Sequence, residues 1–255
     1  MRRWMAGFIF IVSVILFSLS VYSLMGMYIE EKKDEETLER VMELYENAKK
    51  KKGNKTGKEE AVEIDEGLLA LHEENPDCIG WLKIEGTTID YPVMYHPAKE
   101  NFYLKRNFYG EYSANGSLFI SEACDPKECD NLIIYGHHMK SGKMFAGLEK
   151  YKLKDFYLEH PTVLYRTLYG DEIYQVIAVF CTSVYTQNDF PYYAFVKANG
   201  KEEYDVFIQA CKERAFYNTG CDAVYGEKLL TLSTCEYSRK NGRLVVIAKQ
   251  IRGGD

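Results

Sequence analysis

The sequence predicts a mainly β domain, a barrel or a sandwich with a few added helices, preceded by one apolar N-terminal helix. Two observations support this fold class. After residue 62, eight short runs rich in β-branched, aromatic and aliphatic residues are separated by turn residues. Before them, the chain begins with an apolar stretch far too long for a strand. Composition does not shift along the rest of the chain, so we expect one domain that is large enough for a single substantial core.

The strands and helices follow from hydrophobic periodicity and length. The predicted strands are residues 79–84, 88–93, 117–120, 131–135, 162–165, 173–180, 228–232 and 244–248. Helices are predicted over residues 65–74, 144–156 and 201–215. The last of these places four apolar side chains on one face, namely Tyr204, Phe207, Ile208 and Cys211.

The apolar N-terminal stretch predicts a transmembrane anchor. Trp4 to Ile29 contains no charged residue and is longer than the roughly 20 residues that cross a bilayer. Arg2 and Arg3 precede the stretch and Glu30 follows it, so the positive-inside rule predicts a cytoplasmic N-terminus and an extracellular domain. The alternative is a cleaved signal peptide. The apolar run is longer than a signal h-region and lacks a good cleavage site, which favours a retained anchor.

The segment after the anchor is dominated by charge. Within it, one apolar stripe at helical spacing predicts a helix over residues 34–50 that packs on the domain; its members are Leu38, Val41, Met42, Tyr45 and Ala48. The lysine run that begins at Lys49 could contact anionic lipid or wall polymers, but a solvated linker is the preferred interpretation. The expected organisation is therefore an anchor over residues 1–29, a charged linker with a helix over 30–62, and a domain over 63–255.

Charge and cysteine content restrict the function. The net charge is −6 and the pI is near 5.5, which gives no support to nucleic-acid binding. Seven cysteines leave at least one thiol unpaired, although Cys124 with Cys129, or Cys211 with Cys221, could form disulfides. No Cys-x-x-Cys pair or histidine spacing typical of a metal site occurs, so we expect no metal and no cofactor.

Cys235 is the candidate nucleophile. It follows the predicted strand 228–232, where a loop could present its sulfur, and Arg243 begins the next strand. A guanidinium beside a thiol favours the nucleophilic thiolate and can donate hydrogen bonds to an oxyanion. The alternative is an inert cysteine at the end of a core strand.

Two adjacent histidines supply the candidate acid and base. The apolar strand 131–135 ends at Gly136 and is followed by His137 and His138, of which only one is expected to face the site. Imidazole suits proton transfer to and from amines because its pKa lies near neutrality. His138 is expected to be an ordinary residue of the strand end. The chain order His, Cys, Arg differs from that of papain-like peptidases.

Together these motifs resemble the sortases, membrane-anchored cysteine transpeptidases of Gram-positive bacteria, and class B in particular. The resemblance rests on Asn131-Leu-Ile-Ile-Tyr-Gly-His137, Thr231-Leu-Ser-Thr-Cys235 and Gly242-Arg243-Leu-Val-Val, in that order. Further similarity runs from about residue 65 to the C-terminus. It implies an eight-stranded sortase-type β-barrel, and the 201–215 helix corresponds to the helix that class B enzymes insert before the cysteine strand.

The resemblance also implies roles for single residues. Cys235 would attack the threonine carbonyl of a sorting signal, His137 would act as acid and then base, and Arg243 would hold the signal and stabilise the oxyanion. Tyr193 is preferred over its neighbour Tyr192 as the tyrosine that lines the site. The residues implied to contact the substrate are Ser233, Tyr193, Asn101, Leu104 and Glu236.

The implied reaction joins a secreted protein to the cell wall. The resemblance implies a C-terminal sorting signal of the Asn-Pro-x-Thr type as donor and a peptidoglycan amine as acceptor. A pilin-polymerising sortase, which would use a lysine of another pilin as acceptor, is one alternative. A non-catalytic wall-binding protein on the same fold and a cysteine peptidase that releases the thioacyl enzyme with water are the others.

Overall fold

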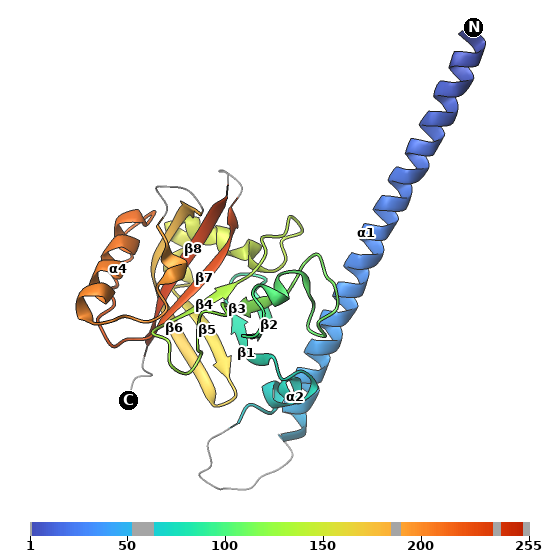
Figure 1. Cartoon of the computed structure of the whole chain (residues 1–255). Helices are drawn as coiled ribbons and strands as arrows, with labels where there is room; N and C mark the ends of the chain where they lie inside the picture. Colours follow the sequence, from blue (N-terminus) through green and yellow to red (C-terminus); the bar gives the residue numbers. More distant parts are fainter. Residues whose placement is uncertain (1, 53–63, 185–189, 237–240, 252–255) are drawn as a thin grey trace.

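A closed eight-stranded β-barrel forms the body of the protein. The computed structural model describes residues 2–52, 64–184, 190–236 and 241–251. The strands are β1 (Cys78–Lys83), β2 (Asp90–Met94), β3 (Leu118–Ile120), β4 (Asn131–Tyr135), β5 (Thr162–Thr167), β6 (Gly170–Ser183), β7 (Leu229–Glu236) and β8 (Gly242–Ile251). They close in the order β1-β2-β3-β4-β7-β8-β6-β5 (Figure 1). The predicted eight-stranded barrel is confirmed, and the sandwich alternative is excluded.

Two neighbouring strand pairs are parallel, and they matter for the site. β2 pairs with β3 and β4 pairs with β7 in parallel register, whereas the other neighbours are antiparallel. In a parallel pair the carboxyl ends of both strands meet at one end of the sheet. The residues that follow β4 are therefore brought to the end of β7, where Cys235 lies.

The barrel interior holds the main hydrophobic core. Aliphatic and aromatic side chains of all eight strands fill it, and many are fully buried, among them Leu82, Val93, Ile134, Leu232 and Val246. At roughly 1.5–3 kcal/mol for each large side chain removed from water, this cluster is the main source of stability.

Helix α4 (Lys201–Arg214) covers the outer face of β6, β7 and β8. The predicted helix is confirmed, and so is its buried face of Tyr204, Phe207, Ile208 and Cys211. Phe207 stacks on Phe195, with ring centroids 3.9 Å apart. Figure 1 shows α4 on the far side of the barrel from α1. The segment between β6 and β7 is thereby fixed against the strand that carries Cys235.

The N-terminal helix α1 (Arg2–Lys52) is continuous from the apolar stretch into the charged segment. The charged residues after Ile29 do not interrupt it, because Glu and Lys are good helix formers and no Gly or Pro occurs between residues 30 and 52. Its first half is exposed, and it is the one helix within the described residues that is long and apolar enough to cross a membrane. In Figure 1 this half extends away from the barrel.

The second half of α1 packs on the barrel, as the apolar stripe predicted. Val41 and Tyr45 are buried, Leu38 is partly buried against the core, and Met42 remains exposed. Helix α2 (Glu66–Glu74) packs beside it and begins at Asp65, whose side chain accepts a hydrogen bond from the Leu68 amide. The predicted boundary at residue 62 falls in 53–63, outside the described residues.

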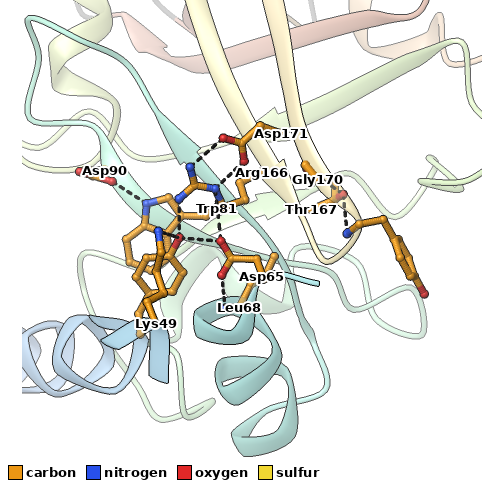
Figure 2. A network of polar contacts seen from close by, with 11 residues as sticks. Lys49, Asp65, Leu68, Trp81, Asp90, Arg166, Thr167, Gly170 and Asp171 are labelled. Atoms are coloured by element: carbon orange, nitrogen blue, oxygen red, sulfur yellow. Dashed lines mark hydrogen bonds and ion pairs between the residues drawn. The ribbon is translucent and has the colours of Figure 1, made fainter. Parts of the chain in front are cut away.

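A polar network joins α1 to the barrel at Tyr45. Figure 2 shows Arg166 of this network between Asp65 and Asp171. Arg166 of β5 donates to the Tyr45 hydroxyl over 2.5 Å and forms a two-pronged ion pair with Asp171 of β6. Asp65 accepts from the Tyr45 hydroxyl and lies 3.4 Å from the Arg166 Nε. Trp81 stacks on Tyr45 at 4.5 Å. We call Tyr45, Asp65, Arg166 and Asp171 the Tyr45 network.

The prediction of one helix over residues 144–156 is wrong. The segment forms a 3-10 helix η2 (Phe145–Lys152) and a short α-helix α3 (Lys154–Glu159), separated by Leu153 in an extended conformation. Gly147 disfavours a regular helix here, and it lies against Thr87, where a Cβ would approach the threonine side chain to 2.9 Å. Two further 3-10 turns, η1 (Phe102–Lys105) and η3 (Tyr192–Ala194), lie near the site.

Candidate active site

The sequence had suggested that Cys235 lies in a loop after its strand, but Cys235 lies within β7. β7 continues to Glu236, and Cys235 pairs directly with Arg243 of the antiparallel strand β8. Residues directly opposite each other in an antiparallel pair point to the same face, with Cβ atoms about 4.5–5.5 Å apart. The thiol and the guanidinium therefore share one face of the sheet. Both side chains are half-buried.

The register of β4 aligns His137 with this pair. Tyr135 pairs with Ser233 in the parallel ladder, and the Gly136 amide donates to the Ser233 carbonyl over 3.2 Å. β4 ends at Tyr135, and His137 follows it by two residues, just as Cys235 follows Ser233 in β7. The parallel pairing therefore brings the chain that carries His137 to the end of β7. We call the candidate acid, nucleophile and cation, which lie at adjacent ends of β4, β7 and β8, the row.

One nitrogen of His137 is held by the backbone of η1. The Nε2 atom lies 2.7 Å from the Leu104 carbonyl oxygen. A carbonyl can only accept, so Nε2 carries the hydrogen and Nδ1 is the nitrogen that can exchange a further proton. Gly116, with φ of 60°, makes this contact possible, because a Cβ there would lie 2.4 Å from the Leu104 oxygen.

His138 has a defined place that the sequence did not predict. Its Nδ1 atom lies 3.2 Å from the Cys235 carbonyl oxygen and 3.6 Å from a carboxylate oxygen of Glu149. The side chain therefore holds the backbone of the nucleophile and does not belong to the row of His137. The contact spans 97 residues, so no local pattern could have indicated it.

Ser233 lies on the same face as Cys235, two residues before it, but is buried. Its hydroxyl hydrogen-bonds to the Tyr192 hydroxyl over 2.7 Å. Asn131 fixes the segment that carries Tyr192, because its amide donates to the Phe195 carbonyl and its oxygen accepts from Thr231. This arrangement explains two of the three polar residues before Cys235 in the cysteine strand. Thr231 and Ser233 bind specific side chains and do not face solvent, whereas the buried Thr234 hydroxyl has no hydrogen-bond partner within the described residues.

Tyr192 and Tyr193 occupy different environments. Burial raises the pKa of Tyr192 to about 12, although the Ser233 hydrogen bond and the Arg243 charge act to lower it. Tyr193 is half-buried and packs edge-on against the Tyr192 ring at 5.5 Å. The structure thus places Tyr192 in contact with the strand, whereas Tyr193, the residue preferred from the sequence, lies beside it.

The remaining predicted contact residues lie around the row. Leu104 is half-buried in η1 and contributes its carbonyl to His137, and Asn101 is exposed just before η1 with a φ of 52°. Glu236 ends β7 opposite Gly242, and its side chain lies outside the described part of the chain.

The other six cysteines lie outside the row, and none of the seven forms a disulfide within the described residues. Burial raises the pKa of Cys78 to about 12 and also raises the pKa of Cys211. The Cys124 pKa is raised because its thiol hydrogen-bonds to Cys129. Cys221 accepts from the Gln175 amide. Within residues 2–52, 64–184, 190–236 and 241–251, no group of three His, Cys, Asp or Glu side chains is arranged to hold a metal ion.

Comparison with known proteins agrees with this geometry. A family model described as the sortase domain matches residues 82–251. Sortase B of Listeria monocytogenes is 34% identical over 196 residues, covering 74% of this chain and 76% of that protein. Sortase B of Staphylococcus aureus is 28% identical over 257 residues, covering 97% of this chain and 98% of that protein.

The fold comparison leads to the same group. The structure of a Staphylococcus aureus sortase B–substrate complex superimposes with a TM-score of 0.75 at 27% identity. The superposition covers 89% of this chain and 100% of that one. The residues that match the sortase family model include His137, Cys235, Arg243 and helix α4. The chain therefore belongs to the sortase family, and within it to the class B cysteine transpeptidases.

Proposed function

We propose that this protein cleaves a C-terminal sorting signal of the Asn-Pro-x-Thr type after the threonine and transfers the new carboxyl end to a peptidoglycan amine. The observation that carries the proposal is the row at the ends of β4, β7 and β8, in which Cys235 pairs with Arg243 and His137 follows β4 by two residues. The structural relative solved as a substrate complex supports a peptide donor.

In the first step, the Cys235 thiol would pass its proton to Nδ1 of His137, and the resulting thiolate would attack the threonine carbonyl carbon. A carbon–sulfur bond forms and the carbonyl oxygen becomes negative, and Arg243 is placed to stabilise it with guanidinium donors. The carbon–nitrogen bond then breaks. The departing amine takes a proton from Nδ1 of His137, while Nε2 keeps its hydrogen bond to Leu104.

In the second step, the acceptor amine would attack the thioacyl carbon. Nδ1 of His137 removes a proton from the incoming nitrogen, a new amide bond forms, and the sulfur leaves with its electron pair. Ser233 and Tyr192 stabilise the wall of the site, and Tyr193, Asn101, Leu104 and Glu236 remain our proposed contacts for the peptide. We assign these roles from the position and the chemistry of each side chain together.

The proposed location follows from α1. Arg2 and Arg3 before the apolar half favour a cytoplasmic N-terminus, which leaves the barrel outside the cell. Secreted donor proteins and lipid-linked wall precursors both pass this surface. The membrane anchor would then keep the enzyme where its donor and acceptor meet.

Product analysis tests the proposal directly. Full-length protein in detergent is incubated with a panel of sorting-signal peptides, with and without an amine acceptor, and the products are identified by mass spectrometry. We expect cleavage after threonine and an amide product when amine is present, and no turnover by Cys235→Ala. Hydrolysis alone under both conditions would identify a peptidase, and binding without turnover by the wild type would identify a non-catalytic protein. A ladder of linked pilins would identify the pilin-polymerising alternative.

A further inference from the structure

Two loops hold His137 in place. The Leu104 loop, residues 101–117, supplies the carbonyl that accepts from His137 Nε2. The His138 loop, residues 138–145, folds back so that the Phe145 amide donates to the His137 carbonyl over 2.8 Å and His138 bridges to Met144. Since η1 is a single turn and the rest of both loops is irregular, the position of His137 depends on what fixes these loops.

One turn of α1 binds the Leu104 loop. The Asp34 carboxylate accepts from the Ser113 hydroxyl over 2.6 Å and from the Asn115 side-chain amide over 3.0 Å. Ser113 and Asn115 are buried, with exposures of 3% and 9%, so these bonds are shielded from water. Lys33 adds an ion pair with Glu111 at 3.1 Å.

The same turn binds the His138 loop. Lys143 lies 2.7 Å from Glu35 and 3.6 Å from Glu31. The hydrogen bond from Lys143 lowers the pKa of Glu35, which keeps the carboxylate charged. A second tie comes from the barrel, because the Thr88 hydroxyl donates to the Gly142 carbonyl over 2.9 Å. These ion pairs join this loop to α1.

This turn of α1 lies directly after the apolar span. Asp34 follows the last apolar residue, Ile29, by five positions, or about 8 Å at the helical rise of 1.5 Å per residue. The helix therefore reaches the barrel as soon as it leaves the apolar span. Figure 1 shows that α1 passes beside the barrel here and extends past it on the side away from the C-terminus.

We infer that residues 31–35 form a positioning clamp, through which the membrane anchor fixes both loops that hold His137. Asp34 and Lys143 are positioning residues, since they act through the loops and touch no reacting atom. The part of the inference that concerns turnover rests on the proposed function. The anchor helix is then a component of the active-site architecture as well as a tether.

The test compares full-length variants in detergent micelles. Lys143→Met and Asp34→Ala each remove one arm of the clamp. Glu36→Gln is the matched control, because Glu36 is an exposed carboxylate of the same helix that forms no ion pair within the described residues. We expect kcat for a sorting-signal peptide to fall about 10- to 100-fold in both clamp variants with KM unchanged, the loss typical of a misplaced catalytic group. Lys143→Arg should retain most of kcat.

Hydrogen–deuterium exchange supplies a readout that does not depend on turnover. We expect faster exchange in the clamp variants at the Phe145 amide and across residues 101–117, with β7 and β8 unchanged. Wild-type rates in the clamp variants, with kcat equal to that of Glu36→Gln, would overturn the inference. If the wild type turned over no peptide, the proposed function would fail, and exchange alone would still decide whether the clamp holds the loops.

Discussion

Helix α1 contacts the barrel in two regions that differ in what they hold. At its C-terminal end, the Tyr45 network joins α1 to strands β5 and β6 through Arg166 and Asp171. Nearer the apolar half of the helix, the clamp of residues 31–35 joins α1 to two irregular loops. Strands are already fixed by their ladders, whereas loops need partners from elsewhere. The Tyr45 network therefore serves stability, and the clamp serves the geometry of His137.

The largest expected effect is a loss of turnover without a loss of stability when His137, the residue that the clamp positions, is replaced. His137→Ala should lower kcat about 10²- to 10⁴-fold, the usual contribution of a general acid and base. Because His137 is half-buried and outside the main core, the midpoint of thermal unfolding should change little. Peptide turnover and thermal unfolding are measured on the same preparation. An equal loss in His138→Ala, the neighbouring control, would contradict the assignment of His137.

The converse is expected at the Tyr45 network. Arg166→Met should lower the free energy of unfolding by about 2–4 kcal/mol, because it leaves Asp65 and the Tyr45 hydroxyl without their cation. Turnover by the folded fraction should remain close to that of the wild type. Denaturant unfolding and peptide turnover test the two parts. Arg166→Lys keeps the charge but loses the planar fork of the guanidinium, so its free energy of unfolding should lie between those of the wild type and Arg166→Met.

A smaller loss of turnover is expected when the backbone carbonyl that binds His137 is displaced. Gly116→Ala places a Cβ against the Leu104 carbonyl at a positive φ, so the acceptor of the His137 hydrogen bond must shift. We expect about a tenfold loss of kcat, since a shift of less than 1 Å in a catalytic group is costly. Gly220→Ala is the matched control, because Gly220 is also at positive φ, a Cβ there meets no atom within 4 Å, and it lies outside both loops that hold His137. Equal kcat in the two variants would show that the position of the Leu104 carbonyl does not affect turnover.

The smallest effect is a pH dependence of stability in the Tyr45 network. Hydrogen bonding to Arg166 lowers the pKa of Asp171. A carboxylate with a lowered folded pKa adds stability above its unfolded value, about 3.9, and loses it as the pH falls through the folded value. The wild type should thus be more stable than Asp171→Asn at pH 7, and the difference should shrink below about pH 4. Thermal unfolding across this range measures it, and a constant difference would contradict the pair.

The sequence predicted the barrel and the row of the site, but not their details. Periodicity located eight strands, yet it ended the cysteine strand at residue 232, because Ser233 and Thr234 are polar and resemble a loop. The structure explains the difference for Ser233, whose partner Tyr192 is 41 residues away. The contacts of His138 with Cys235 and of Asp34 with Ser113 span 97 and 79 residues. Pairs of this kind depend on the folded topology and leave no local pattern.

We propose that Cys235 forms a thioacyl enzyme with a sorting signal. To test this, full-length protein is mixed with an Asn-Pro-x-Thr peptide in the absence of any amine, quenched in acid and analysed by intact-protein and peptide mass spectrometry. We expect an added mass equal to the acyl group of the peptide through its threonine, located on Cys235 and released by hydroxylamine. An adduct on another cysteine, or cleavage of the peptide by Cys235→Ala, would contradict it.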